Sequence, residues 1–217
     1  MRGVSYSVKE SKAEKLGNFI VKQIKENRTR FFTVIGFTVG ILFLAVFVYT
    51  RWQSLDYSAS DRLSAAFALL GMGDRAQAVQ YLNDTISRFP NTAAAYQARL
   101  TAGDILTEEA KYDEALPLFQ RTYEKGNPPS FKPLALFRII YLYGSKKDYD
   151  NAIFYSNEFI KKFSSNYLIK DVYMNLAQFY AFKNLPEESR RVYREILINF
   201  PATNEAAKAD EILKGLR

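Results

Sequence analysis

Residues 111–119 read KYDEALPLF, and three other nine-residue segments share the same order of polar, small and apolar positions. These are residues 74–82 (DRAQAVQYL), residues 148–156 (DYDNAIFYS) and residues 185–193 (LPEESRRVY). Each segment carries a small residue, and consecutive small residues lie 37 positions apart at Ala78, Ala115, Ala152 and Ser189. A fixed period of this length indicates stacked pairs of helices.

Turn signals recur with the same period. Eleven positions after each small residue come Phe89, Gly126, Phe163 and Phe200, and a proline follows the first and the last of them. With the other Gly, Pro and Asn clusters, these positions predict helices over residues 58–71, 74–88, 93–109, 112–125, 131–145, 149–163, 166–183, 187–199 and 203–215. No second helix follows the last range, which we therefore interpret as a terminal cap.

The segments resemble the tetratricopeptide repeat, in which a small residue near the start of the second helix (helix B) allows close approach to the first (helix A). A large residue usually follows four positions later, here Leu82, Phe119, Ser156 and Tyr193. The resemblance covers about residues 58–201 and implies an all-α fold, a right-handed helical solenoid of about four repeats with a C-terminal capping helix. The third repeat departs most, because Ser156 is polar and Ile139 and Ile140 are bulky.

An uncharged run precedes the repeats, from Phe31 to Tyr49 (FFTVIGFTVGILFLAVFVY). A helix of this length spans about 28 Å, close to the ~30 Å hydrocarbon core of a bilayer. We therefore expect the solenoid to lie behind one transmembrane helix. The predicted domains are a basic cytoplasmic tail (1–30), the transmembrane helix (31–50), a short linker (51–57) and the repeat domain (58–217).

The charges around the run predict its orientation. The chain has 30 basic and 23 acidic residues, of which the first 51 positions hold nine basic and three acidic ones. Since excess Lys and Arg marks the cytoplasmic flank, we expect a single-pass protein of the inner membrane with a periplasmic or other extracytoplasmic C-terminal domain. Tyr49 and Trp52 suit the outer interface. A cleaved signal peptide is the alternative, but the run exceeds the ~7–15 residues of a signal core.

The basic tail itself predicts a lipid partner. Leu16, Ile20 and Ile24 recur every four positions beside Phe19, with lysines at other positions, as in an amphipathic helix on a membrane surface. A solvated, disordered tail is the alternative. A nucleic-acid partner is not expected, because the repeat domain carries almost no net charge and the basic part adjoins the apolar run.

The composition also argues against an enzyme. The chain has no Cys and no His, which excludes disulfides, thiolate and histidine metal sites, and histidine general bases. Three carboxylate pairs, Glu108–Glu109, Asp113–Glu114 and Glu187–Glu188, lie at predicted helix ends, where solvation and the helix dipole explain them. We expect no cofactor, no metal and no small-molecule substrate.

Protein binding is the predicted function. In repeats of this type, two helix-A positions usually face a groove that binds extended peptides or partner helices. Counting back from the small residues gives one set at Leu63, Leu100, Phe137 and Met174, and a second set at Phe67, Asp104, Tyr141 and Gln178. Half of such residues can instead belong to the core between helices. Gly36 and Gly40 form a GxxxG motif, which predicts contact with another transmembrane helix.

The order of the segments resembles a second family, the ancillary subunit of the bacterial SecYEG translocon. The basic tail, the NRTRFF entry into the apolar run and the SASDRLSAAFALL helix after it carry this resemblance. It implies an accessory, chaperone-like role, with the SecYEG channel, a periplasmic chaperone and exported polypeptides as partners. A scaffold or adaptor for assembly of cell-envelope or division complexes is the alternative.

Overall fold

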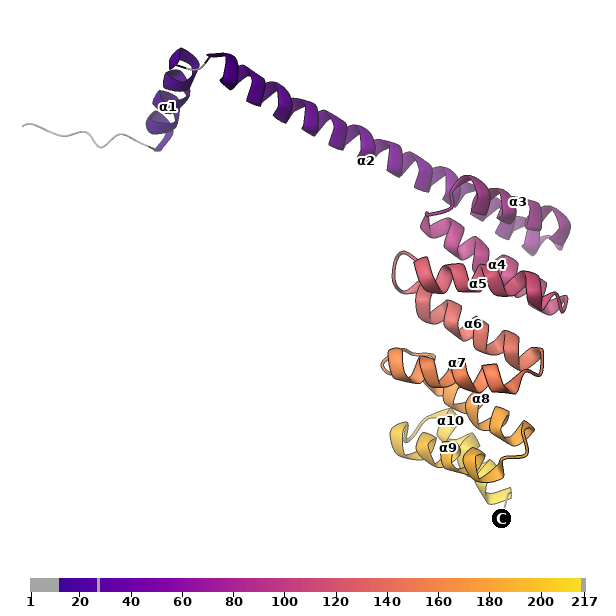
Figure 1. Cartoon of the computed structure of the whole chain (residues 1–217). Helices are drawn as coiled ribbons and strands as arrows, with labels where there is room; N and C mark the ends of the chain where they lie inside the picture. Colours follow the sequence, from indigo (N-terminus) through magenta and orange to yellow (C-terminus); the bar gives the residue numbers. More distant parts are fainter. Residues whose placement is uncertain (1–11, 27, 216–217) are drawn as a thin grey trace, which may run out of the picture. The chain divides into compact units, whose positions relative to one another are not determined.

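The computed structural model describes residues 12–26 and 28–215, which form ten helices and no strand (Figure 1). The helices are α1 (Lys12–Glu26), α2 (Arg28–Gly71), α3 (Arg75–Arg88), α4 (Ala93–Glu108), α5 (Tyr112–Lys125), α6 (Phe131–Ser145), α7 (Tyr149–Lys162), α8 (Ile169–Phe182), α9 (Pro186–Asn199) and α10 (Asn204–Gly215). The chain divides into two units, Met1–Ser54 and Leu55–Arg217, which are described separately.

In the first unit, the apolar run forms the N-terminal part of α2. Among the described residues, α2 is the one helix that is long and apolar enough to cross a membrane, and its apolar stretch is not buried within the chain. The Thr33 and Thr38 hydroxyls donate hydrogen bonds to backbone carbonyls of the preceding turn, at 2.7 and 2.9 Å. The helix therefore satisfies its own polar groups, as an apolar environment requires.

Two expectations for the N-terminal part need correction. Residues 51–57, predicted as a linker, are helical, and the helix predicted to start at residue 58 is the last part of α2. The segment has no Gly or Pro, so nothing in it ends a helix. The tail is helical over α1, with Leu16 and Phe19 exposed. Residues 1–11 and the side chains of Ile20 and Ile24 lie outside what the structure describes.

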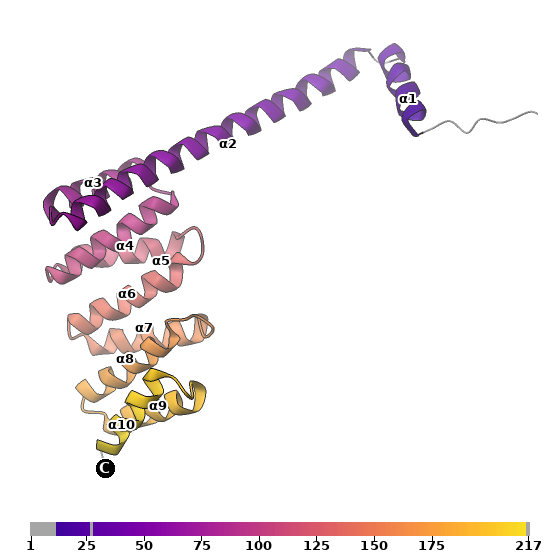
Figure 2. The same ribbon diagram turned by 180° about the vertical axis from the view of Figure 1, so that it is seen from behind.

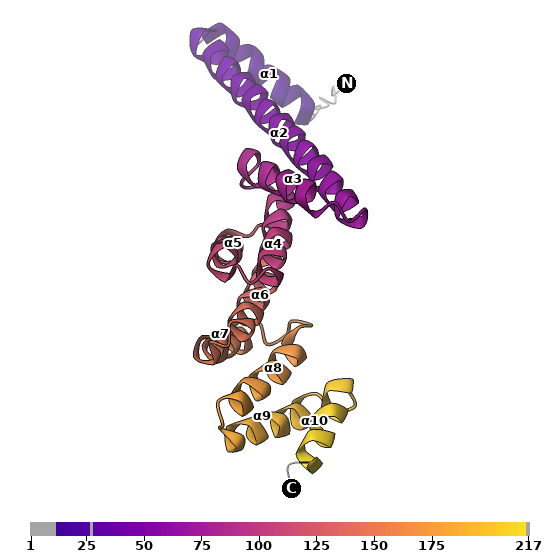
Figure 3. The same cartoon turned by 90° about the vertical axis from the view of Figure 1, so that its right-hand side faces the viewer.

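In the second unit, consecutive helices pack side by side along the stack (Figures 1 and 2). The end of α2 with α3, α4 with α5, α6 with α7 and α8 with α9 form the four helix A–helix B pairs. The last helix, α10, packs on α9, with Ala206 and Ala209 buried against Val192 and Ile196 (Figure 3). This arrangement confirms the predicted all-α solenoid of about four repeats with a capping helix.

Every helix A ends in the same tight turn. Gly73, Ala110, Lys147 and Asn184 have φ of 82°, 58°, 62° and 56°, at the 37-residue period. In each turn the next backbone N–H donates to a carbonyl five positions earlier, as Asp74 does to Leu69 at 3.0 Å. This is a Schellman motif, which ends a helix and reverses the chain. Ala110 and Lys147 adopt this conformation although their side chains disfavour it.

The repeat's small residues lie where helices A and B meet. Ala78, Ala115, Ala152 and Ser189 are each 0% exposed, on α3, α5, α7 and α9. The polar Ser156 is accommodated in the third repeat because its hydroxyl donates to the Ala152 carbonyl at 2.7 Å. The bulky Ile139 and Ile140 are buried in two different core clusters.

The predicted helix boundaries agree with the observed ones to within a residue or two, with one further exception. The helix predicted to begin at residue 166 begins at Ile169. Asn166 instead forms a turn, in which its side-chain oxygen accepts a hydrogen bond from the Leu168 N–H at 3.0 Å. The internal Pro117 does not interrupt α5, although it is the sixth residue of the helix and lacks a backbone N–H donor.

Candidate polypeptide-binding site

The first predicted set of groove residues belongs largely to the core. Leu100 is 2% exposed and packs in one cluster with Ala115 and Phe119 of α5, so its assignment to the groove is corrected. Phe137 and Met174 are half-buried and pack against neighbouring clusters. Leu63 is also half-buried, beside the cluster that contains Ala66. A partner can reach only the edges of these three side chains.

The second set is more accessible. Phe67 is 42% exposed and Tyr141 is 59% exposed, Gln178 is also exposed, and Asp104 is half-buried. We call these four residues the helix-A strip, because each lies at the same register on α2, α4, α6 or α8. The strip presents two aromatic rings, one carboxylate and one amide.

One hollow on the strip lies between α4 and α6. It measures about 310 Å³ and is lined by Asp104, Thr107, Glu108, Phe137, Arg138 and Tyr141. Three of these lining residues were predicted from the sequence, namely Asp104, Phe137 and Tyr141. Arg138 lies across the hollow from Asp104, with its Nε 3.3 Å from a carboxylate oxygen. The hollow therefore combines the edge of the Phe137 ring, the exposed Tyr141 ring and the Asp104–Arg138 ion pair.

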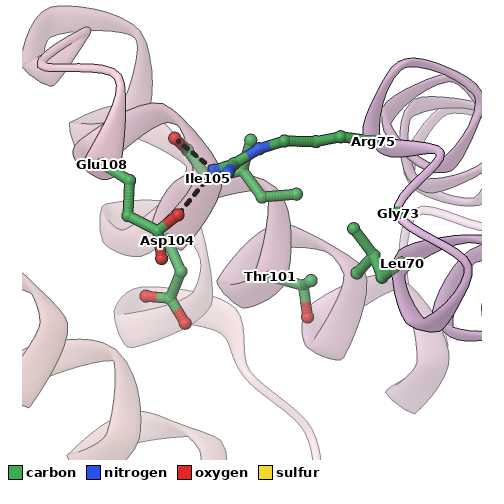
Figure 4. A pocket seen from close by; sticks show the side chains of 7 residues that line it. All are labelled: Leu70, Gly73, Arg75, Thr101, Asp104, Ile105 and Glu108. Atoms are coloured by element: carbon green, nitrogen blue, oxygen red, sulfur yellow. Dashed lines mark hydrogen bonds and ion pairs between the residues drawn. The ribbon is translucent and has the colours of Figure 1, made fainter.

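A second hollow adjoins the first and shares Asp104. It measures about 380 Å³ and is lined by Leu70, Gly73, Arg75, Thr101, Asp104, Ile105 and Glu108 (Figure 4). Arg75 extends from α3 to α4, with its Nη2 2.6 Å from Glu108 and 3.4 Å from the Ile105 carbonyl. Figure 4 shows Asp104 pointing away from this pair. Asp104 thus lines both hollows along the helix-A side of α4.

The electrostatics of the strip centre on Asp104. Burial raises the pKa of its carboxyl group, and the Arg138 guanidinium only partly opposes this effect. Ionised Asp104 is therefore incompletely solvated, and a donor from a bound chain would improve its environment. A backbone N–H of an extended peptide is such a donor.

A larger hollow, about 660 Å³, lies on the helix-B side between α3, α4 and α5. Its apolar residues include Val79, Ile105, Leu106 and Leu118, and charged residues such as Arg75 and Lys111 also line it. No residue predicted as a site from the sequence lines this hollow.

The remaining predicted contact residues lie in the apolar part of α2. At Gly36 and at Gly40, an added Cβ would meet no atom within 4 Å in the described part of the chain. Within residues 12–26 and 28–215, no group of three or more acidic side chains is placed to hold a metal ion.

Two residues that sequence reasoning missed, Arg138 and Glu108, complete the site. Arg138 could have been found from its spacing, because it lies 34 positions after Asp104, which is nearly one repeat. This spacing places the two side chains on adjacent A helices. Glu108 was interpreted as a helix-end charge. In the structure, the Glu108 carboxylate also forms an ion pair with Arg75.

Residues 27–167 match the model of the tetratricopeptide repeat-like domain family. The chain belongs to this family. The matched range includes all of α2 and runs past the end of α7, so it covers both the apolar helix and three of the four helix pairs. Repeat domains of this family act as protein-binding scaffolds, and the general prediction of protein–protein interaction is therefore supported.

A solved structure shares the fold of this tetratricopeptide repeat-like chain. It is a tetratricopeptide repeat protein from Parabacteroides merdae, with 15% sequence identity and a TM-score of 0.59. The alignment covers 73% of this chain and 59% of that protein. At this identity the likeness concerns the fold alone. No protein with curated annotation matches the chain.

Proposed function

We propose that this chain is a single-pass membrane protein whose repeat domain binds extended polypeptide segments along the helix-A strip, outside the cytoplasm. The observation that carries the proposal is the position of Tyr141, which is 59% exposed and lines one hollow with Phe137 and the Asp104–Arg138 ion pair. A large aromatic ring that stays in solvent next to a hollow and an ion pair is typical of a binding surface.

The membrane part of the proposal rests on the first unit. The apolar stretch of α2 up to Tyr49 is not buried, and a bilayer would cover its side chains. The excess of basic residues before this stretch favours a cytoplasmic N-terminus. The proposed domains are the tail at 1–30, the transmembrane helix at 31–50, a helical connection at 51–57 and the repeat domain at 58–217. The proposed contacts with lipid involve the anchor and the basic tail.

We further propose that the protein is an accessory, chaperone-like subunit at the Sec translocon, where it contacts exported polypeptides as they emerge. A binding surface without catalytic groups acts by its location, and a membrane anchor holds it where new chains appear. The segment order supports this role. A scaffold or adaptor in cell-envelope or division complexes is the second proposal, since the same surface could hold one folded partner.

Photo-crosslinking tests the binding surface and separates the two roles. A photoreactive amino acid would replace Tyr141, and Phe154 would serve as the matched control. Phe154 is 62% exposed, but it lies on α7, which is a B helix. The proposal predicts a broad smear of nascent chains from position 141 and little product from position 154. One discrete product from position 141 would favour the scaffold, and equal products from both positions would refute the strip.

Cysteine labelling tests the orientation. Because the chain has no native Cys, single cysteines can be introduced at Lys12 and at Lys161, which are both exposed. In intact spheroplasts, a membrane-impermeant maleimide should label position 161 and not position 12. Labelling of position 12 alone would show the opposite topology. Recovery of the protein in the soluble fraction would contradict the proposed membrane anchor.

A further inference from the structure

In the first, second and fourth repeats, one position on helix A lies within electrostatic range of one position on helix B. The helix-A position lies sixteen residues before the repeat's small residue, and the helix-B position six residues after it. In the first repeat, Arg62 and Asp84 occupy these positions and form an ion pair. In the fourth, Tyr173 lies within electrostatic range of Glu195. A helix-B carboxylate therefore belongs to this position.

The second repeat breaks the pattern. Its helix-B position is Arg121, whereas the other three repeats carry Asp84, Glu158 and Glu195 there. The first three repeats also carry a basic residue one turn later on helix B. It is Arg88 in the first repeat and Lys162 in the third, where each pairs with the carboxylate, and it is Lys125 in the second. At these three positions the first repeat has two cations and one carboxylate. The second repeat has three cations there, namely Arg99, Arg121 and Lys125.

The missing carboxylate leaves Arg99, which is buried, without a counter-charge. The residue is 5% exposed, and its Nη1 is fully buried without a hydrogen-bond partner. Its guanidinium lies over the Tyr96 ring, 5.1 Å from the centroid. Across residues 12–26 and 28–215, no carboxylate pairs with Arg99 or Arg121. The exposed Glu124, three residues after Arg121, pairs with neither.

A buried cation without a counter-charge is costly. Burial is the main cause that lowers the pKa of Arg99, the Tyr96 phenol opposes it, and the charge of Arg121 lowers the pKa further. An anion between the two guanidinium groups would remove both penalties, since each planar fork can donate two parallel hydrogen bonds to an oxyanion. Arg121 is exposed, so this place is open to solvent on one side.

We propose that Arg99 and Arg121 form an oxyanion-binding site, filled by a carboxylate side chain of a bound polypeptide. The ligand supplies the carboxylate that the other repeats carry themselves. Arg99 and Asp104 are five residues apart on α4, or about 140° around the helix. The site therefore lies on a different face from the helix-A strip and is independent of the function proposed above.

Thermal unfolding of the full-length protein in detergent tests the site, with inorganic phosphate as the probe and the ionic strength held constant with NaCl. The midpoint should rise by roughly 3–6 °C for each tenfold of phosphate above its Kd. Arg99→Met should abolish the rise. Arg121→Glu should also abolish it and should raise the midpoint without phosphate, because the repeat then has its own carboxylate. The charge-matched control Arg194→Glu, at an exposed position of α9, should keep the wild-type response.

A pair of blocked peptides, one with a central glutamate and one with glutamine, identifies the source of the anion. The glutamate peptide should bind the wild type about tenfold more tightly, and Arg121→Glu should erase this preference. A phosphate response with equal binding of both peptides would overturn the polypeptide source and leave a site for free anions. No phosphate response in the wild type, or the same response in Arg99→Met, would overturn the site itself.

Discussion

Gly103 provides a sharp test of how closely helices A and B approach. In α4 this glycine faces α5, and a Cβ added to it would lie 2.5 Å from Cε1 and 2.6 Å from Cζ of Phe119. Carbon atoms in ordinary contact are about 3.5–4.0 Å apart. Phe119 is 1% exposed, so its ring must move by about 1 Å within a filled core. Gly103→Ala should therefore cost about 1–3 kcal/mol by overpacking, against a gain of about 1 kcal/mol in helix propensity.

Gly71→Ala is the matched control, because a Cβ there meets no atom within 4 Å and it also lies in a helix A. Chemical unfolding of the full-length protein, followed by helical circular dichroism, should place Gly103→Ala about 1–3 kcal/mol below the control. Adding Phe119→Leu to Gly103→Ala should recover part of the loss, since the two sites are in contact. Equal stability of Gly103→Ala and Gly71→Ala, or a double mutant without coupling, would refute the close approach.

Three further predictions concern other parts of the chain. Ala115→Leu, at a position that is 0% exposed, should lower stability by about 1–3 kcal/mol in the same unfolding assay, and an unchanged midpoint would contradict the assigned repeat register. Because the folded-state pKa of Asp104 is raised, its favourable contribution is present at low pH and is lost as the pH rises through that pKa. Asp104→Asn should thus raise the melting temperature at neutral pH, and the difference should shrink below about pH 4; a difference independent of pH would argue against the raised pKa. Gly36→Leu with Gly40→Leu should reduce recovery of a membrane partner from mild detergent without changing the melting of the repeat domain, and full recovery would remove the proposed helix contact.

Much of the fold follows from the 37-residue period. The small residues, the apolar positions near them and the turn signals located every helix of the repeat domain, because these features repeat in register. Other features depend on what the period does not specify. Ala110 and Lys147 adopt the left-handed turn conformation although neither residue type favours it. Residues 51–57, predicted as a short linker, are helical because they lack a helix breaker.

The site was predictable in its location and less so in its composition. The period places two candidate positions on each helix A, but it does not show which one the next helix covers. Leu100 is covered by Ala115 and Phe119, while Tyr141 remains exposed at the neighbouring register. The Asp104–Arg138 pair depends on how far side chains reach between adjacent repeats. That distance is a property of the superhelix and is not contained in the repeat pattern.

The proposed role of the helix-A strip is to bind unfolded polypeptide. Its most direct test is the affinity of the full-length protein, in detergent or nanodiscs, for a fluorescently labelled, permanently unfolded secreted protein. We compare Tyr141→Ser on the strip with Phe154→Ser on α7, two aromatic residues that are 59% and 62% exposed. We expect Tyr141→Ser to weaken binding about tenfold, which corresponds to about 1.4 kcal/mol, and Phe154→Ser to leave binding unchanged. Equal affinities for the two variants, or a larger loss with Phe154→Ser, would show that the strip is not the binding surface.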